Sequence, residues 1–192
     1  MKQIITAVKV FAAMAILTGI VYPLLITAVS QLAFNKQANG SLVIVDGQIK
    51  GSELIAQKFD QDKYFWARPS AFDYNTLSSG GSNLSATSRQ LRGQIKEREK
   101  TILKVDPTKQ AKDIPSDLLY SSGSGLDPHI SISAALFQID RILRSRKLDF
   151  SRKADMIELI NMVTRDRDFK LLGERRINVL KLNILLDREF DK

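Results

Sequence analysis

Residues 10–29 read VFAAMAILTGIVYPLLITAV, and they contain no charged side chain. At about 1.5 Å per residue, a helix of this length spans roughly the 30 Å hydrocarbon core of a bilayer. A cleaved signal peptide is the alternative, because Ala28-Val29-Ser30 resembles a small-x-small cleavage site. Signal peptides usually have an apolar region of only about 7–15 residues. The length therefore favours a single transmembrane helix, placed at residues 10–34 after a short N-terminal segment, residues 1–9.

The cations beside this helix predict its orientation. Lys2 and Lys9 precede it, whereas Lys36 is the only cation in the first dozen residues that follow residue 29. Cytoplasmic flanks of membrane helices are enriched in Lys and Arg. We therefore expect a cytoplasmic N-terminus and an extracytoplasmic domain at residues 35–192.

Small residues and a proline suggest that this helix has a helical neighbour. Ala15 and Gly19 form a small-xxx-small pair, which allows the backbone of another helix to approach closely. Pro23 leaves the carbonyl of Gly19 without its usual donor, so a kink is expected there. Gly and Pro are also common in membrane helices that have no partner, which is the alternative.

Composition excludes several kinds of site. The chain has 192 residues, no cysteine and one histidine. Disulfides, cysteine nucleophiles and metal sites built from several histidines are therefore excluded, and we predict no metal site. The formal net charge of +8 is compatible with a position near anionic lipid or an acidic partner. We expect no nucleic-acid binding, because no basic arm is interleaved with aromatic residues.

The rest of the chain predicts an α+β fold, with one mixed α/β soluble domain after the membrane helix. Asp46-Gly47 lies between two apolar runs and predicts a hairpin turn. Ser52 is a candidate cap for a short helix. Residues 177–190 are ambiguous between strand and helix, and we favour helix because of their length. The other expected elements are a loop at 73–88, helices at about 84–104, up to 147 and from 151, and a Gly/Ser loop at 121–129.

The helix that ends near Lys147 has two candidate starts. Asp127 could cap it with Pro128 at the first helical position, or Ser131 could cap it one turn later. The spacing of Ile132, Leu136, Ile139 and Leu143 predicts the buried face of this helix.

Two Gly/Ser loops and one aromatic segment are the candidate sites. A glycine-rich loop at Ser79, Gly80, Gly81, Ser82 and Asn83 could bind phosphate through its backbone N–H groups. Phosphate loops with catalytic reach usually continue into Gly-Lys-Ser/Thr, and this chain has no Gly-Lys dipeptide. A structured turn or a loop that contacts a partner is therefore the favoured interpretation.

Ser124, Asp127 and His129 lie close together in the second loop and raise the question of a nucleophilic site. Residues so near in sequence do not generally form a triad, so we favour a capping and loop-fixing role and predict no catalytic residue. Arg68 follows Tyr64-Phe65-Trp66-Ala67, where it could make a cation–π or carboxylate contact. Core packing with a buried partner for the arginine is the favoured interpretation.

Seven stretches, in order along nearly the whole chain, resemble the C subunit of the bacterial Kdp potassium-transporting P-type ATPase, the KdpC family. The chain departs from the family pattern at three positions. Ala56 and Ala67 replace typical glycines, and Ile132 stands where the family tends to have Pro. The matching stretches are residues 18–24, 38–42, 51–59, 64–71, 79–84, 122–131 and 178–183.

The resemblance implies an accessory, non-catalytic subunit in the inner membrane of a bacterium. Its partners would be a potassium-conducting subunit and an ATP-hydrolysing P-type subunit, because this chain has no Asp-Lys-Thr-Gly phosphorylation motif. Partner contacts are expected at the face carrying Ala15, Gly19, Tyr22 and Pro23, and at Arg68, Ser124, Asp127 and His129.

The family has been described as a catalytic chaperone of ATP binding, which would place ATP at residues 79–83. An extracytoplasmic domain cannot reach cytosolic ATP, so our topology favours an external cap on the potassium-conducting subunit instead. A membrane-tethered or secreted binding module is the alternative function.

Overall fold

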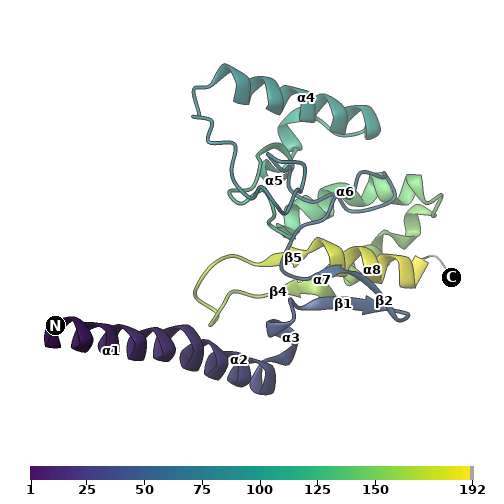
Figure 1. Cartoon of the computed structure of the whole chain (residues 1–192). Coiled ribbons are helices and arrows are strands. Elements are labelled where there is room, and N and C mark those ends of the chain that lie inside the picture. Colours follow the sequence, from purple (N-terminus) through teal and green to yellow (C-terminus); the bar gives the residue numbers. More distant parts are fainter. Residues whose placement is uncertain (191–192) are drawn as a thin grey trace. The chain divides into compact units, whose positions relative to one another are not determined.

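The computed structural model describes residues 1–190 and divides the chain into two compact units, residues 1–50 and 51–192 (Figure 1). Unit 1 contains α1 (Lys2–Ile16), a π-helical segment (Leu17–Val21), α2 (Tyr22–Ala33), α3 (Asn35–Ala38), β1 (Leu42–Val45) and most of β2 (Gln48–Ser52). Unit 2 contains α4 (Arg89–Val105), α5 (Ser116–Leu119), β3 (His129–Ile130), α6 (Ile132–Ser145), α7 (Lys153–Val163), β4 (Thr164–Arg165), β5 (Arg176–Asn178) and α8 (Val179–Phe190), with 3₁₀ turns at Ala111–Asp113 and Phe150–Arg152.

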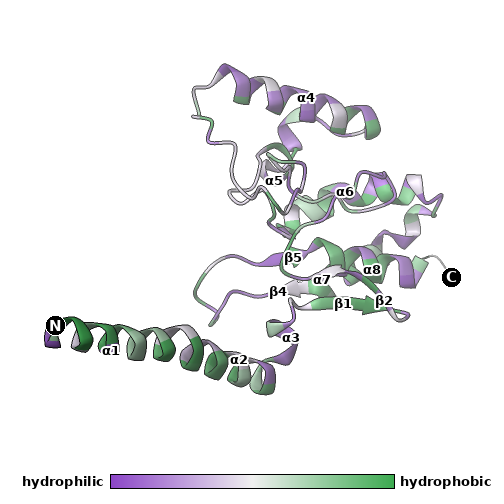
Figure 2. Ribbon diagram, viewed as in Figure 1, coloured by the Kyte–Doolittle hydropathy of each residue, from purple (hydrophilic) through white to green (hydrophobic). Residues whose placement is uncertain are grey.

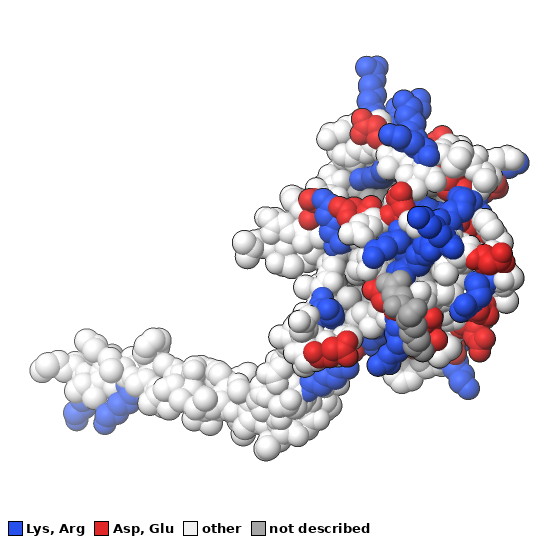
Figure 3. Space-filling view, turned by 90° about the vertical axis from the view of Figure 1, so that its right-hand side faces the viewer, with Lys and Arg blue, Asp and Glu red and all other residues white. Residues whose placement is uncertain are grey.

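A continuous helix from Lys2 to Ala33 forms most of unit 1. Within the described residues, it is the one helix long and apolar enough to cross a membrane. It is hydrophobic along its length in Figure 2, and Figure 3 shows charged atoms at its N-terminal end and none along its middle. No residue of α1 or α2 is buried, so the described residues leave the apolar surface of this helix exposed.

The helix responds to Pro23 with a change of hydrogen-bond pattern. Residues 17–21 form a π-helical turn, and the Tyr22 N–H donates to the carbonyl of Leu17, five residues earlier. A π turn is one of the local adjustments that satisfy backbone groups near a proline in a membrane helix. The helix continues through this point in Figure 1.

The predicted hairpin is confirmed. β1 and β2 pair with each other and are joined by Asp46 and Gly47, whose φ values are +50° and +74°. Positive φ at both central residues is typical of a type I′ turn, which matches the twist of the strands it joins.

Unit 2 has its core where α6, α7 and α8 meet a small antiparallel sheet. The strand order is β3-β5-β4, and Ile130 and Thr164 both pair with Ile177. Ile177 therefore lies on the central strand and is fully buried. The core also contains Phe65, Ala134, Ile139, Ile142, Leu143, Met156, Ile160, Leu182 and Leu186.

Side chains of α6 and α8, rather than a neighbouring strand, hold the extended aromatic segment. Asn183 bonds both backbone groups of Phe65, at 2.8 and 3.0 Å. Gln138 likewise accepts from the Trp66 N–H at 2.7 Å and donates to its carbonyl at 3.3 Å. Buried backbone polar groups need partners, and here amide side chains supply them.

The structure decides between the two candidate caps of α6 and corrects two predictions. Ser131 caps α6, with its Oγ accepting from the Ala134 N–H at 3.1 Å, so Asp127 is not the cap. The helix predicted from Ser52 is wrong: the Ser52 Oγ accepts from the Leu54 N–H and closes a turn. The prediction of a buried Leu136 is also wrong, because this side chain is exposed.

Residues 177–190, for which both strand and helix were considered, contain both. Residues 176–178 form β5, and the favoured helix follows directly as α8. The Asn178 Oδ1 accepts from the Lys181 N–H at 3.1 Å, so the strand ends on a side chain that caps the next helix.

α4 is a hydrophilic helix that packs on α5 at the edge of unit 2 (Figures 1 and 2). Ser88 caps it, and Ile102 is its one buried residue among those described. Arg98 fixes it to the following loop, with guanidinium bonds to the Leu119 carbonyl at 2.6 Å and to the Ser121 Oγ at 3.0 Å.

Candidate functional site

The two Gly/Ser loops lie against each other. The Gly80 N–H donates to the Ser124 carbonyl at 2.8 Å, and the Ser79 Oγ donates to the same oxygen at 2.9 Å. We call residues 79–83 and 122–125 the paired loops. Some 40 residues separate them in the sequence, so neither loop composition alone predicts this contact.

Close backbone approach explains two of the glycines. A Cβ on Gly81 would lie 3.0 Å from the Gly123 carbonyl oxygen. A Cβ on Gly125 would lie 2.8 Å from the Gly80 carbonyl oxygen, and Gly125 has a φ of +70° that favours glycine in any case. These glycines are therefore required by contact between the loops, independently of any phosphate.

The segment that follows Arg68 is hydrogen-bonded to the second of the paired loops. The Ser122 N–H donates to the Pro69 carbonyl at 3.1 Å. The Ser70 Oγ accepts from the Tyr74 N–H, and the Tyr74 hydroxyl donates to the Arg68 carbonyl at 2.8 Å. Burial raises the pKa of Tyr74 to about 12, so this hydroxyl keeps its proton and remains a donor.

Arg68, Asp127 and His129 come together beside the paired loops. One Asp127 carboxylate oxygen lies 3.3 Å from a guanidinium nitrogen of Arg68. The other accepts from the His129 N–H at 3.0 Å and lies 3.3 Å from His129 Nδ1. Burial opposes ionisation of Asp127, but the bonds from His129 and the charge of Arg68 outweigh it and hold the pKa of Asp127 below its ordinary value.

Ser124 does not join this group. Its Oγ accepts from the Leu126 N–H at 3.1 Å, and its carbonyl is the acceptor for the other loop. A nucleophile requires a base within hydrogen-bond reach, and Ser124 has local backbone partners instead. Asp127 fixes the turn into β3 through the His129 backbone, which is the loop-fixing role predicted for it.

A cleft of about 260 Å³ opens at Arg68, Asp127 and His129. Arg175 and Arg176, at the start of β5, line its other side. The Arg68 Nε is buried there without a hydrogen-bond partner in the described part of the chain. Three of the predicted partner-binding residues therefore surround one open polar cleft.

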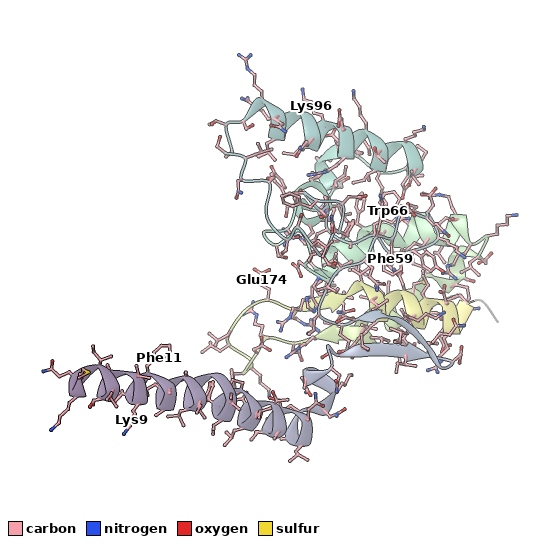
Figure 4. The ribbon with its side chains drawn as sticks, viewed as in Figure 1. Lys9, Phe11, Phe59, Trp66, Lys96 and Glu174 are labelled. Carbon is pink, nitrogen blue, oxygen red and sulfur yellow. The ribbon has the colours of Figure 1, made fainter. Side chains whose placement is uncertain are left out.

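A larger cleft of about 550 Å³ lies elsewhere, between α4 and the aromatic segment. Trp66, Tyr74, Arg98 and Leu118 are among its lining residues, and Figure 4 labels Trp66 and Phe59 on this side of unit 2. Its walls are largely apolar, and Arg98 already donates to the loop beside it. The cleft therefore brings together no evident set of reacting groups.

Sequence reasoning did not identify the polar residues that hold the aromatic segment. Arg141 stacks on the Trp66 ring at 4.0 Å and donates to the carbonyls of Asp62 and Tyr64, at 2.6 and 2.9 Å. Burial lowers the pKa of Arg141 to about 10. The cation on the Trp66 ring is thus Arg141 of α6, and Lys63 and Arg146 lie over the Tyr64 ring, whereas Arg68 faces Asp127. Polar Gln138 and Arg141 on an otherwise apolar helix face were the available signal.

Sequence comparison now places these features in a family. A family model described as "KdpC: K+-transporting ATPase, c chain" matches residues 4–188. The chain belongs to the KdpC family. A KdpC-family relative, the potassium-transporting ATPase KdpC subunit of Paraburkholderia phytofirmans, is 47% identical over 183 residues, covering 94% of this chain and 93% of the relative. The KdpC subunit of Leptospira interrogans is 44% identical over 184 residues, with coverages of 96% and 93%.

The KdpC-family match is therefore continuous. It runs from the apolar helix through the paired loops and the cleft to α8. The resemblance to the KdpC family, inferred from seven separate stretches of sequence, is confirmed over nearly the full length of the chain.

Proposed function

We propose that this protein is a non-catalytic accessory subunit of a bacterial potassium-transporting ATPase. The observation that carries the proposal is the family match over residues 4–188, which includes both the membrane helix and the soluble domain. The relatives are named as KdpC subunits of potassium-transporting ATPases. The chain itself lacks an Asp-Lys-Thr-Gly motif, so ATP hydrolysis is assigned to a partner.

The membrane helix would serve as a contact element within the complex. Apart from the backbone of its own helix turn, no described atom lies within 4 Å of the position of a Cβ on Gly19, so packing inside the described structure does not require a glycine there. Mid-helix glycine is unfavourable compared with alanine by about 1 kcal/mol in soluble helices. Close approach by a second helix accounts for Gly19, together with Ala15, Tyr22 and Pro23 on the predicted contact face.

The soluble domain would act as an external cap on the potassium-conducting subunit. The cleft at Arg68, Asp127 and His129 is preorganised by its own hydrogen bonds and is also lined by Arg175 and Arg176. A rigid polar cleft suits docking to carboxylate or carbonyl groups of a partner. The paired loops hold this cleft in place from one side.

The contacts of residues 79–83 support a structural role more than an ATP site. The Gly80 N–H, which would face a phosphate in a cradle, already donates to Ser124. The presence of glycine at positions 81 and 125 is likewise explained by close contact between the two loops. ATP binding at residues 79–83 stays a prediction of the family resemblance.

A topology reporter fused after Lys192 tests the cap proposal directly. We expect alkaline phosphatase activity, which requires export, and no activity from a reporter that works only in the cytoplasm. Activity of the cytoplasmic reporter would overturn the external cap and support contact with ATP. Purification of the full chain in mild detergent tests the assembly: recovery of larger membrane subunits is expected, and recovery of a lone monomer contradicts it.

A further inference from the structure

The connection between β4 and β5 exposes a concentration of large apolar side chains. Phe169 is 91% exposed, Leu171 78% and Leu172 59%. The connection projects from the rest of unit 2 in Figure 1, and Glu174 marks it in Figure 4. We call residues 166–174 the β4–β5 tip. Three exposed apolar residues within four positions of one loop tip indicate a surface that is covered in use.

The tip is an ordered turn rather than a slack loop. Asp168 and Leu172 bond each other reciprocally through their backbones, both at 2.9 Å. The Lys170 N–H also donates to the Arg167 carbonyl at 3.0 Å. These bonds fix the direction in which Phe169, Leu171 and Leu172 point.

Ion pairs at the base hold the turn in place. The Asp168 carboxylate bonds Arg176 at 2.9 Å and Arg165 at 3.2 Å. Asp166 pairs with Arg175 at 3.0 Å. The two aspartates of the tip are thereby neutralised by cations at its base, and the base is anchored to both strands.

Two consecutive residues at the exposed apex have a left-handed backbone conformation. Phe169 has a φ of +53° and Lys170 a φ of +61°, both in the left-handed region that favours glycine. A bulky aromatic residue in this conformation, pointing into water, has no folding benefit visible in the structure. Strain of this kind is typically retained where the side chain has a function.

Charge indicates what covers the tip. Residues 164–176 carry five cations and three anions, a net charge of +2. Asp166 and Asp168 pair with Arg165, Arg175 and Arg176 at the base. Among the residues described, this leaves Arg167, Lys170 and Glu174 without an ion-pair partner, so two unpaired cations and one unpaired anion lie beside the apolar apex. Apolar side chains beside unpaired Lys and Arg are typical of segments that enter the interface of an anionic bilayer.

The chain also keeps unit 2 near a bilayer. The apolar helix ends at Ala33, and unit 2 begins at Gly51. Seventeen intervening residues span at most about 60 Å even when fully extended. This covalent link raises the local concentration of unit 2 at the membrane surface, so even a weak interfacial contact of one of its loops would be populated.

We infer that the β4–β5 tip inserts Phe169, Leu171 and Leu172 into the interfacial region of the membrane in which the helix is anchored. Arg167 and Lys170 contact lipid phosphates at that surface. The tip is a second, peripheral membrane contact that limits how far the soluble domain can tilt on its tether. This inference needs only the membrane helix, and does not depend on the subunit role proposed above.

The absence of cysteine makes a depth measurement straightforward, because one introduced cysteine carries the only spin label. The full chain with Leu171→Cys is reconstituted in vesicles of phosphatidylcholine with a minor fraction of phosphatidylglycerol. Leu77→Cys is the matched control, since Leu77 is also a loop leucine and is 93% exposed. Power saturation then compares collisions with oxygen, which concentrates in lipid, and with a nickel chelate, which stays in water.

We expect oxygen accessibility to exceed nickel accessibility at position 171 and the reverse at position 77. Adding Lys170→Glu should shift the label at 171 towards the aqueous value, whereas Lys96→Glu on α4 should not. Equal aqueous values at 171 and 77 would overturn the inference. A label at 171 that is aqueous in vesicles, and protected only when larger subunits are co-reconstituted, would also overturn it by identifying a protein as the occupant.

Discussion

The side-chain amide of Asn183 in α8 forms two hydrogen bonds with the backbone of Phe65. Its Oδ1 accepts from the Phe65 N–H at 2.8 Å, and its Nδ2 donates to the Phe65 carbonyl at 3.0 Å. Phe65 and Asn183 are both buried, so no solvent can replace these bonds. The aromatic segment, which has no strand partner at this point, depends on this amide for its place in the core.

Replacing Asn183 with Leu should destabilise unit 2 strongly. The change removes both hydrogen bonds and leaves two buried backbone groups unsatisfied, a cost of about 2–4 kcal/mol in the free energy of unfolding. Chemical unfolding of the full chain in detergent measures the effect. Asn161→Leu on the exposed face of α7 is the matched control and should change the free energy little. Equal effects of the two variants would show that the amide of Asn183 is unimportant.

The glycines of the paired loops should differ sharply in their tolerance to alanine. Gly125→Ala places a Cβ 2.8 Å from a backbone oxygen at a φ of +70°, so we expect a loss of more than about 1 kcal/mol of stability. Gly123→Ala meets no atom within 4 Å and should be nearly neutral. Thermal unfolding of the two full-length variants distinguishes them.

The same pair of variants tests whether the loops matter to the complex. If the paired loops support the cleft, Gly125→Ala should reduce recovery of partner subunits and potassium uptake in a strain that depends on this system. Gly123→Ala should leave both unchanged. Loss of recovery with both variants would indicate a direct contact by the loop surface rather than support by loop pairing.

Local sequence patterns predicted the elements that depend on only a few neighbouring residues. The apolar helix and the Asp46-Gly47 hairpin follow from patterns within a few residues of each feature. Local patterns left the cap of α6 open between Asp127 and Ser131, and the structure shows Ser131. The helix predicted at Ser52 failed because serine also closes short turns by bonding the N–H two residues ahead, and its sequence signal is the same.

The arrangement of the candidate site was not predictable from one sequence. Loop composition identified residues 79–83 and 122–129 separately, but contact between Gly80 and Ser124 depends on the path of the whole chain between them. Asp127 was correctly assigned to loop fixing, since its bond to the His129 N–H is local. Simple packing was the favoured interpretation for Arg68, and its ion pair with Asp127, a residue far away in the sequence, is visible only in the fold.

Acid should weaken a bridge centred on Asp140. Lys109 and Lys153 donate to its two carboxylate oxygens at 2.6 and 2.7 Å. Burial opposes ionisation of Asp140, but these two cations outweigh it and hold the pKa of Asp140 below its ordinary value. A carboxyl whose pKa is lower in the folded state stabilises that state above the unfolded pKa, about 3.9, and loses this contribution as the pH falls through the folded pKa.

Asp140→Asn should therefore cost stability at neutral pH, and the difference from the unaltered chain should shrink only below about pH 4. Unfolding of both full-length chains between neutral pH and pH 3 measures this. Asp113→Asn, at an exposed 3₁₀ turn, serves as the control. A difference that persists undiminished at pH 3 would mean that the asparagine acts through packing rather than charge.

The contact face of the membrane helix can be tested with two alanines on α1. Ala15 belongs to the predicted face, and Ala13 lies roughly 200° away around the helix, since each residue advances by about 100°. Both precede the π-helical turn at residues 17–21, so the comparison does not depend on how that turn rotates the rest of the helix. Ala15→Leu should block close approach of a partner helix and lower recovery of the larger subunits roughly tenfold, the effect of about 1.4 kcal/mol. Ala13→Leu should leave recovery unchanged, because it adds the same side chain to a lipid-facing surface. If Ala13→Leu were the disruptive variant, the partner would lie on the opposite face, and Gly19 would need another explanation.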